Sequence, residues 1–541
     1  MGRQRKRDNI AVIDAETDQF REGRQVYPFI WGFYDGINYR VFRKTHELVT
    51  FLKTYNGYVY AHNGGKFDYH FLIDYAELGQ KIKVINGRIS RWKLGKCVLL
   101  DSWNILPMPL AAMEKEKFEY WKMDICVREL FMAEIEKYLQ SDCVNLWKFV
   151  KRYINDYGQK LTQAGSAFTF WQEKIHKQKP YFKKSAAGKK WYDKFRPYYY
   201  GGRVTPFRGG IFNDPPNETF KVVDINSAYP RAMMEMHPWG FKYVTTKHPH
   251  DAELATALVT FTADSYGALP VRNKDGGISF PDVKNHTFET VGHELIAGIE
   301  TGTVKNVKII QACVFEQQIN FVGYVNHFYE MKKHASETGD KATRTFAKLF
   351  LNSLYGKFAS AAHKYQEFIL MDNYPDIAEM IELREKGYEA GESLGNTVFW
   401  SRDLPPEKWT YYNIITAASI TSWVRAFLWR SIQQVENPYY CDTDSIICDA
   451  VGDLRISPEL GDWDQEAEGD LLAIGGKKLY ALRLINDEGW KTASKGAKLT
   501  PDDILMISGG GAVEYTAQAP LYSVKQKSKK LTRTIKNTLQ L

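Results

Sequence analysis

The stretch PYYCDTDSIICD, residues 438–449, decides how this chain folds. It sets two aspartates, Asp442 and Asp444, between two aromatic and apolar halves that each suit a β-strand. A tight hairpin of this sequence carries both carboxylates on one side, where they can share a divalent cation with a third acid from elsewhere. A DTD tripeptide by itself is more often an ordinary hairpin turn. Its meaning therefore depends on the other motifs of the chain.

Two segments upstream of this hairpin carry matching chemistry. Asp224 follows an apolar strand in KVVDINSAYPRAM, residues 221–233, and KLFLNSLYGKF occupies residues 348–358. Three polar side chains of the second segment fall at helical spacing: Lys348, Asn352 and Tyr355. They can therefore face one ligand, with the ammonium group on a triphosphate and the phenol ring against a base or sugar.

A second set of carboxylates lies near the amino terminus. In VIDAETD, Asp14 and Glu16 stand two apart at the end of an apolar strand, so strand alternation puts them on one face. Two carboxylates so close repel one another unless a cation lies between them, as in two-metal phosphodiester sites. Asp68 follows in AHNGGKFDYHFL, and KYLQSD puts Tyr138 one helical turn before Asp142. Each motif alone suits a solvated surface, but together they indicate a nuclease-type metal site.

Composition and charge limit the possible functions. The chain has 541 residues, too many for one ordinary domain, and 44% of them are hydrophobic, enough for several cores. Its formal net charge of +8 permits a polyanionic partner. The six cysteines are scattered without a CxxC pair, so we expect a reducing compartment and no zinc site. The sequence shows no membrane-spanning stretch, no GxxxxGK[ST] loop and no HExxH motif, which argues against a kinase or a zinc hydrolase.

Hydrophobic periodicity predicts an α/β pattern followed by mixed structure. The predicted strands are Ile10–Asp14, Pro28–Tyr34 and Tyr58–His62, and the predicted long helices are Met132–Tyr153, about 323–356 and about 414–435. Stretches near 264–288 and 371–397 are rich in Gly, Asp and Asn and are predicted to be loops or insertions. A basic, aromatic connector at 174–208 and an acid-free tail at 515–541 suit either DNA phosphates or a solvated face.

Both sets of motifs resemble those of one family. DxxSxYP, KxxxNSxYG and YxDTDS, in this order, resemble the three polymerase motifs of family B DNA polymerases. DxE, HNxxxFD and YxxxD resemble the three exonuclease motifs of proofreading DNA polymerases of the DnaQ-like, RNase H-like class. The resemblance implies an α/β plus α+β multidomain fold. An RNase H-like 3′–5′ exonuclease domain would precede a right-hand polymerase of palm, fingers and thumb with two insertions.

The resemblance also implies roles for the acids. Asp224 and Asp444 would be the principal Mg²⁺ ligands of the polymerase site, with Asp442 beside them. In the exonuclease site Tyr138 would orient the attacking water, and the metal ligands would be Asp14, Glu16, Asp68 and Asp142. Two Mg²⁺ ions are expected in each active site, and Mn²⁺ is expected to substitute for them. Ala15 replaces a larger apolar residue of many relatives, but no ligand is missing.

Substrate contacts follow from the same resemblance. Tyr229 would be the steric gate that excludes a 2′-hydroxyl and so selects deoxynucleotides. The residues expected around the incoming nucleotide are Lys348, Asn352, Tyr355, Arg344, and Lys333 or its neighbour Lys332. The residues expected to hold a frayed 3′ end are Thr17, His62, Asn63 and Phe67.

Two smaller elements narrow the resemblance to protein-primed members of the family. YYGG matches their YxGG connector, whose tight turn lets the backbone approach the template, with Tyr199, Gly201 and Gly202 as contacts. Lys478-Leu479-Tyr480 matches their KxY element, in which Lys478 and Tyr480 contact the primer terminus. Segments such as WGFYDG and KTASKGAKL look most similar to polymerases of tectiviruses, the membrane-containing phages with linear, protein-capped DNA.

Protein-primed members carry two insertions, and the spacing between the polymerase motifs leaves room for both. The expected units are the exonuclease domain (1–165), the first part of the palm (166–235), a first insertion that binds terminal protein and duplex (236–322), the fingers (323–359), a second insertion that opens the downstream duplex (360–404), the second part of the palm (405–495) and the thumb (496–541). The acid-free tail would let the thumb grip duplex phosphates.

The expected function is replication of linear viral DNA from a terminal-protein primer, with two-metal nucleotidyl transfer, 3′–5′ proofreading and strand displacement. The expected partners are DNA template and primer, dNTPs, the terminal protein and a single-stranded-DNA-binding protein, with no membrane. The chain is expected to be monomeric by itself and to act in the cytoplasm of an infected bacterium. The alternatives are a nucleic-acid-primed family B polymerase, a nuclease that uses only its first domain, and a decayed DNA-binding relative. Because all seven acids are present, decay is disfavoured.

Overall fold

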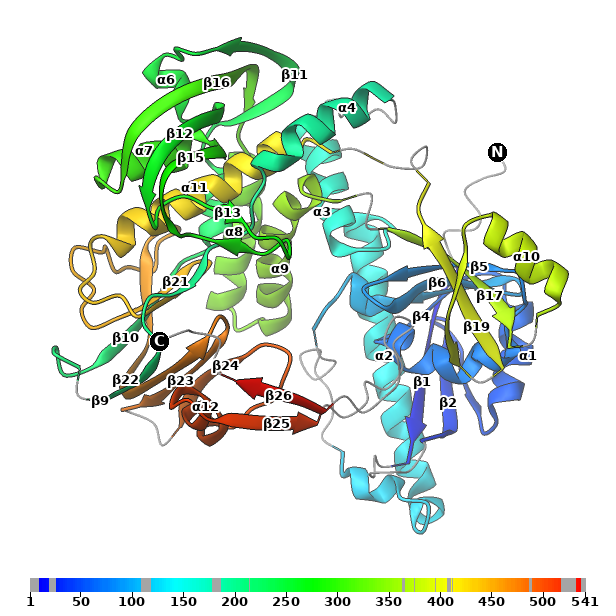
Figure 1. Cartoon of the computed structure of the whole chain (residues 1–541). Helices are drawn as coiled ribbons and strands as arrows, with labels where there is room; N and C mark the ends of the chain where they lie inside the picture. Colours follow the sequence, from blue (N-terminus) through cyan, green and yellow to red (C-terminus); the bar gives the residue numbers. More distant parts are fainter. Residues whose placement is uncertain are drawn as a thin grey trace.

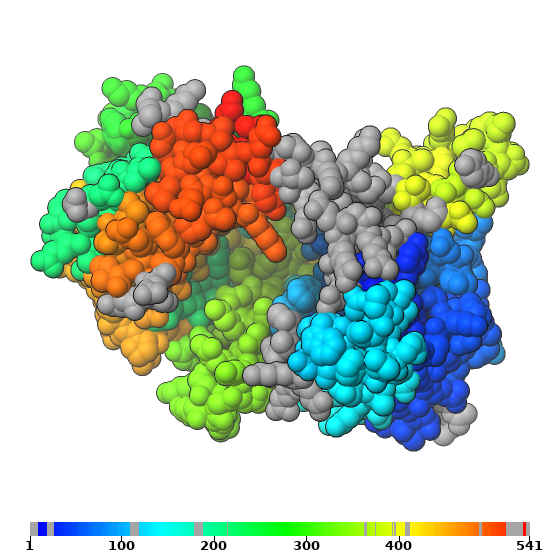
Figure 2. Space-filling model, turned by 90° about the horizontal axis from the view of Figure 1, so that it is seen from below, coloured from blue at the N-terminus to red at the C-terminus, as the bar shows by residue number. Residues whose placement is uncertain are grey.

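The computed structural model describes residues 9–18, 26–108, 118–177, 186–213, 215–361, 365–373, 375–394, 396–405, 410, 412–485, 489–516 and 532–536. In Figure 1 the blue and cyan amino-terminal part, joined by yellow strands from much later in the chain, forms one lobe. The green, orange and red parts form the other. From below, Figure 2 shows the orange and red part on one side and the blue and cyan part on the other, with bright-green atoms between them at the lower edge.

A ten-stranded mixed sheet forms the first lobe, in the order β18-β19-β17-β5-β6-β7-β4-β1-β2-β3. Its strands are β1 (Ile10–Thr17), β2 (Pro28–Tyr34), β3 (Tyr39–Phe42), β4 (Tyr58–Ala61), β5 (Lys81–Ile85), β6 (Arg88–Leu94), β7 (Cys97–Asp101), β17 (Gln366–Asp372), β18 (Glu389–Leu394) and β19 (Thr397–Asp403). Helices α1 (Thr45–Thr54) and α2 (Met132–Tyr157) accompany them. The strands and helix predicted in this region are confirmed, although β1 runs on to Thr17 because β2 pairs with its polar end.

The region of the predicted second insertion belongs to this sheet, and the stretch near 371–397, predicted to be a loop or an insertion, forms regular structure rather than a loop. Strand β17 pairs with β5 of the amino-terminal region, and the Gly79 N–H donates to the Leu370 carbonyl at 2.7 Å. Helix α10 (Ile377–Glu385) and strands β18 and β19 complete the segment. Alternate residues of its strands, Phe368, Leu370 and Phe399, are buried in the core of the first lobe. Burial of these apolar side chains stabilises strands in the segment, although its Gly and Asn content favours turns.

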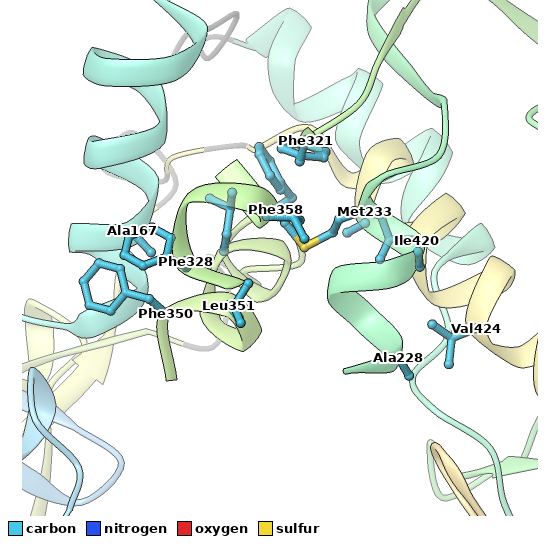
Figure 3. Packing of buried hydrophobic residues seen from close by; sticks show 14 of the residues in the cluster. Ala167, Ala228, Met233, Phe321, Phe328, Phe350, Leu351, Phe358, Ile420 and Val424 are labelled. Carbon is cyan, nitrogen blue, oxygen red and sulfur yellow. The ribbon is translucent and has the colours of Figure 1, made fainter. Parts of the chain in front are cut away.

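The second lobe is built on an eight-stranded sheet, β24-β23-β22-β10-β21-β20-β8, with β9 paired to β22. Its strands are β8 (Val204–Pro206), β9 (Gly210–Asn213), β10 (Phe220–Ile225), β20 (Tyr440–Asp442), β21 (Ser445–Cys448), β22 (Trp463–Gly476), β23 (Leu479–Leu484) and β24 (Trp490–Ser494). The helices packed on it include α5 (Ala228–Met233), α8 (Val322–Glu337), α9 (Lys341–Phe358) and α11 (Ile414–Ile432). Figure 3 shows the apolar core in which Phe358 of α9, Met233 of α5 and Ile420 of α11 meet.

The segment predicted as helix at about 323–356 consists of two helices, α8 and α9, and this corrects the prediction of one unbroken stretch. Gly339 between them has a φ of +72°, a conformation that favours glycine. The Asp340 side chain then accepts from the Thr343 N–H at 2.9 Å and caps α9. The two helices pack side by side, so the turn brings residues of α8 and α9 to one surface.

The region of the predicted first insertion is a four-stranded sheet, β11-β16-β12-β15, and the stretch near 264–288, predicted to be a loop or an insertion, contributes strands to it. Its elements are β11 (His237–Thr246), α6 (Asp251–Leu254), β12 (Leu258–Tyr266), β13 (Val271–Arg272), β14 (Ile278–Ser279), β15 (Asp282–Val291), α7 (Gly292–Glu300) and β16 (Val304–Ile319). Buried polar contacts fix it to the residue before β8 and to α11. The Arg203 guanidinium lies between the rings of Phe280 and Trp429 and donates to the Gly267 carbonyl at 2.7 Å.

The remaining described elements connect or end these units. Helix α3 (Gln163–Phe170), π-helix η7 (Trp171–His176), helix α4 (Ala186–Phe195) and 3₁₀ helix η8 (Arg196–Tyr198) link the lobes. Helix α12 (Pro501–Ser508) and the hairpin of β25 (Ala512–Thr516) and β26 (Thr532–Lys536) follow the second sheet. Residues 178–185 of the predicted basic connector, and residues 517–531 and 537–541 of the predicted tail, lie outside the described residues. None of the helices in the described ranges is long and apolar enough to cross a membrane.

Candidate active sites

The sheet of the second lobe brings three aspartates together. Asp224 is the second-to-last residue of β10, and its register partner in β21 is Ser445, the first residue of that strand. Asp442 ends β20, and Thr443 turns the hairpin with a φ of +63°. The Ile225 N–H donates to the Asp444 carbonyl at 2.8 Å, which ties the turn to β10. The predicted DxD hairpin is therefore present, and it lies beside the third acid.

The electrostatics of these acids favour a bound cation. Burial, and then the charge of Asp444, raise the pKa of Asp224 to about 7. Burial, and then the charge of Asp442, raise the pKa of Asp444 to about 6. Glu466 adds repulsion to both, because a β-bulge in β22 leaves it between the partners of Val222 and Val223. Clustered carboxylate oxygens that repel one another fit Mg²⁺, which prefers oxygen ligands.

The KxY element lies against the same acids. The Lys478 ammonium group donates to both carboxylate oxygens of Asp442, at 2.6 and 2.7 Å. The Lys478 backbone has a φ of +56°, and its N–H donates to the Tyr440 hydroxyl at 2.8 Å. The Tyr480 ring lies 5.2 Å from the Tyr440 ring. The two predicted primer contacts thus lie at the edge of the carboxylate cluster, and Asp442 has a protein counter-ion.

The predicted gate residue is locked in a ring stack. Tyr229 on α5 and Tyr355 on α9 are parallel within 4°, with ring centroids 4.2 Å apart. Gly202 closes the other side. A Cβ atom at Gly202 would lie 2.8 Å from Thr443 Cγ2 and 3.1 Å from the Tyr229 hydroxyl. Glycine is therefore required for this close approach, whereas Gly201 has open space around it.

Helix α9 presents the predicted triphosphate contacts on its exposed face. Lys348 and Asn352 are exposed, and the Asn352 amide donates to the Lys348 carbonyl at 3.0 Å. The positive charge of Lys348 acts on Asp224, which places this face beside the acids. Burial and the charges of Lys348 and Arg344 lower the pKa of Lys332. Of the two lysines left open by the sequence, Lys332 is thus the one that joins this cation cluster, while Lys333 is exposed.

A buried ion pair that the motifs did not reveal holds the YYGG connector. Arg425 on α11 donates to both oxygens of Glu294 on α7, at 2.8 and 2.7 Å, and both side chains are 2% exposed. The same guanidinium donates to the carbonyls of Tyr200 and Gly201 at 2.8 and 2.7 Å. The region of the predicted first insertion is therefore tied to the YYGG connector by a buried ion pair. In the sequence, the sign of this ion pair was Arg425, a charged residue within a largely apolar helix segment.

The acids of the first lobe converge as the spacing predicts. Ligand oxygens of Asp14, Glu16 and Asp142 all lie within 4.8 Å of one another. Strand β2 and helix α2 approach closely at Gly32, where a Cβ atom would lie only 2.9 Å from Cys143 Sγ. This contact brings Asp142 over β1, since Cys143 is the next residue of α2.

Asp68 is a fourth acid, on which the charge of Asp14 acts. Its carboxyl is 2% exposed, and its Oδ1 atom is buried with no hydrogen-bond partner among the described residues. Burial, and then the charge of Asp14, hold the pKa of Asp68 well above its usual range. A buried carboxylate oxygen without a donor fits a cation ligand. The four acids together can hold the ions that such a site requires.

The residues predicted around the 3′ end divide into two groups. Thr17 ends β1 and Phe67 packs edge-on against Phe71, so both remain near the acids. His62 is different. Its Nδ1 lies 3.1 Å from Ser102 Oγ and its Nε2 lies 2.9 Å from the Met108 carbonyl, so the ring holds the chain behind the site. Direct contact of this imidazole with DNA is therefore not supported by the geometry.

Asn63 has a φ of +63°, and a buried network that the sequence did not reveal holds it there. Arg88 Nη1 donates to Asn63 Oδ1 at 2.5 Å and to Asp101 Oδ2 at 3.0 Å. Asp101 also accepts from the Gly65 N–H at 3.1 Å. A buried ion pair thus fixes the second exonuclease motif. An arginine and an aspartate in two neighbouring strands carry no local signature of this role.

Comparison with known proteins gives a consistent result. Residues 109–445 match the family described as DNA polymerase type B, organellar and viral. The chain is 36% identical over 572 aligned positions to the DNA-directed DNA polymerase of Enterobacteria phage PRD1, with 98% of each chain covered. It is 23% identical over 516 positions to the DNA polymerase of Bacillus phage phi29, with 84% of this chain and 83% of that polymerase covered.

The solved structures agree on the fold. Phi29 DNA polymerase complexed with primer-template DNA and incoming nucleotide superimposes with a TM-score of 0.71 at 18% identity. The alignment covers 98% of this chain and all of that one. The family match, the full-length identity to a viral enzyme and the shared architecture lead to one conclusion: this chain belongs to the type B DNA polymerases of viruses and organelles.

Proposed function

We propose that this chain replicates linear viral DNA, starts synthesis on a terminal protein and edits its product in a separate 3′–5′ exonuclease site. The observation that carries the proposal is the placement of two groups of carboxylates in two different sheets. In the first lobe, oxygens of Asp14, Glu16 and Asp142 lie within 4.8 Å of one another. In the second lobe, Asp444 acts electrostatically on Asp224, and Asp442 acts on Asp444. Membership of the viral and organellar type B polymerases supports DNA-directed DNA synthesis as the main activity.

In the polymerase site, Asp224 and Asp444 would hold the cations. Bound Mg²⁺ activates the attacking oxygen and stabilises the charge of the leaving group. Lys348, which acts electrostatically on Asp224, binds the triphosphate and offsets its charge. The Tyr229 ring lies under the sugar of the incoming nucleotide. Its stack on Tyr355 leaves it little freedom to move, so a 2′-hydroxyl would collide with it.

Lys478 positions the primer. Its ammonium group neutralises Asp442 and lies at the edge of the cluster, where it can exchange one carboxylate contact for a primer phosphate. The left-handed backbone at Lys478 and the hydrogen bond to the Tyr440 hydroxyl fix the direction of the side chain. Tyr480 would pack against the terminal sugar from the next strand.

In the exonuclease site, Asp14, Glu16, Asp68 and Asp142 would hold the cations, and Tyr138 would orient the attacking water. Tyr138 is 2% exposed, and burial raises its pKa, so its hydroxyl stays protonated and acts through hydrogen bonds. Because these acids and the polymerase acids lie in separate sheets, a 3′ end must move between the two sites.

The two insertions and the partner proteins complete the proposal. The second insertion, built into the sheet of the first lobe, would meet the downstream duplex and support strand displacement. The first would receive the terminal protein, whose Ser, Thr or Tyr hydroxyl accepts the first nucleotide. The chain would act as a monomer with primer–template DNA, dNTPs and a single-stranded-DNA-binding protein, in the cytoplasm of an infected bacterium.

The first experiment separates the two sites with Asp444→Asn and Asp14→Asn. A labelled primer–template with Mg²⁺ is incubated with and without dNTPs. Asp444→Asn should abolish extension and retain degradation, whereas Asp14→Asn should do the reverse. Asp470→Asn, which removes an exposed ion pair with Arg483 on the same sheet as Asp444, is the control and should change neither. Loss of both activities in either active-site variant would contradict separate sites.

The second experiment tests priming. The chain is mixed with a viral terminal protein, labelled dNTP and Mg²⁺, and covalent label on the terminal protein is measured after denaturation. Transfer that depends on Asp444 supports protein priming. Extension of DNA primers without any transfer, over a range of terminal-protein and Mn²⁺ concentrations, would favour the nucleic-acid-primed alternative.

A further inference from the structure

The side chain of Arg203 is held largely by the region of the predicted first insertion, residues 236–322. This side chain is only 1% exposed. Its guanidinium carbon lies 4.2 Å from the ring centre of Phe280 and 4.3 Å from that of Trp429. The same group donates to the Gly267 carbonyl at 2.7 Å. Because Phe280 and Gly267 both belong to that region, the position of Arg203 depends on how the region is placed.

The main chain of the same arginine contacts the DTD turn. The Thr443 N–H donates to the Arg203 carbonyl at 2.6 Å. Thr443 has a φ of +63°, a conformation that residues other than glycine adopt at a cost, so the turn needs contacts from outside the hairpin. Arg203 therefore contacts the first-insertion region with its side chain and the turn between the two hairpin aspartates with its backbone.

The strand that follows Arg203 gives the turn little support by itself. Strand β8 has three residues, and it is the last strand in the order of its sheet, next to β20. Its three register pairs with β20 include Asp442 with Val204. Pro206 ends the strand and has no N–H to donate. Because so short an edge strand makes few hydrogen bonds, the buried side chain that precedes it is the anchor of this pairing.

We propose that Arg203 is a positioning residue of the polymerase site, which links the placement of the first-insertion region to the DTD turn and so sets the two hairpin aspartates relative to Asp224. The inference rests on the proposed role of these acids as Mg²⁺ ligands. It adds a residue that lies after the YYGG element and outside the three polymerase motifs. Mg²⁺ demands nearly ideal octahedral geometry, so a small displacement of the turn raises the Mg²⁺ concentration that synthesis requires.

Hydrogen–deuterium exchange of the full chain without metal or DNA tests the link directly, because the Thr443 amide is the donor concerned. Arg203→Met removes the guanidinium and retains an unbranched side chain. It should speed exchange in residues 440–446 about tenfold, roughly the worth of one hydrogen bond, and leave strand β1 unchanged. Arg483→Met removes an exposed ion pair with Asp470 on the same sheet. It is the matched control and should change neither segment.

A second variant tests the link from the other side. Phe280→Leu weakens the ring contact but leaves the buried charge and its hydrogen bond to the Gly267 carbonyl in place. Because a cation–ring contact contributes less than a hydrogen bond from a charged group, exchange in residues 440–446 should rise about threefold. This variant changes no residue of the sheet that carries the acids, and it still tests the link if Arg203→Met does not fold.

Primer extension and degradation of single strands are then titrated with Mg²⁺ in the same proteins. Arg203→Met should raise the half-saturating Mg²⁺ concentration for extension about fivefold and leave that for degradation unchanged, because the exonuclease acids lie in the other sheet. General destabilisation would instead reduce activity without this selective shift.

The inference would be overturned by unchanged exchange in residues 440–446 in both variants, or by a rise that extends equally over β22 and β23. An unchanged Mg²⁺ requirement for extension in Arg203→Met would also overturn it. If Asp444→Asn retains extension, the proposed metal role of the acids fails. The exchange measurement contains neither metal nor DNA, so it still decides whether Arg203 holds the turn.

Discussion

Replacing Glu294 by Gln tests whether the first insertion is an integral part of the polymerase body. The variant leaves the Arg425 guanidinium buried without a counter-charge, although it still donates to the connector carbonyls. Removing one partner of a buried ion pair costs about 3–5 kcal/mol, and the retained amide hydrogen bond favours the lower end. A loss of about 3 kcal/mol lowers the folding equilibrium constant by more than a factor of 100.

The same two helices supply a matched control. Glu300 on α7 pairs with Arg430 on α11 at 2.6 Å, but these side chains are 53% and 36% exposed. Glu300→Gln should therefore cost about 0–1 kcal/mol. Urea denaturation followed by tryptophan fluorescence measures both variants, and primer extension reports on the connector. Equal destabilisation by the two variants would refute the reasoning, because it would mean that burial adds nothing to the Glu294 pair.

The other predictions concern the connector, the palm and acid stability. Gly202→Ala should reduce primer extension at least tenfold, because its Cβ would collide with Thr443, and exonuclease activity on single strands should persist; Gly201→Ala, in open space, should leave the melting temperature unchanged. Lys478→Met should weaken primer binding and raise the KM for primer–template, as measured by steady-state extension, whereas an unchanged KM would exclude the primer contact. Burial lowers the pKa of His237 to about 4, so the neutral ring stabilises the fold above about pH 6.5, and this contribution is lost as the pH falls toward 4. In urea titrations His237→Gln should lose less stability than the wild type between pH 7 and pH 4.5, and parallel losses would contradict this.

The sequence was sufficient to predict the relative placement of residues that lie only a few positions apart. Asp14 and Glu16 share a face because strand alternation has a period of two, and the DTD hairpin forms because apolar halves flank it. Each of these relations spans only a few residues. Local spacing therefore predicted which acids share a face, whereas their roles as site ligands were expectations from the family resemblance.

Contacts between distant segments could not be predicted from local spacing. Glu294 and Arg425 are 131 positions apart, and neither has a local pattern that points to the other. The bulge that places Glu466 where it acts on Asp224 and Asp444 is an irregularity of pairing rather than of composition. The hydrogen bond between Tyr120 and Tyr138 depends on how a 3₁₀ helix is laid against α2. These features are set by packing, which one sequence does not display.

The pairing of β17 with β5 has a consequence for solubility. Without the second insertion, β5 would be the last strand of its sheet and would present unpaired N–H and C=O groups to the solvent. Such an edge recruits strands from other molecules, and apolar residues such as Ile82 lie along it. The insertion thus protects the amino-terminal domain from self-association. A chain trimmed of residues 365–405 should aggregate even where its catalytic residues are intact. Deletion of the segment is therefore not a test of the DNA-handling role proposed for it.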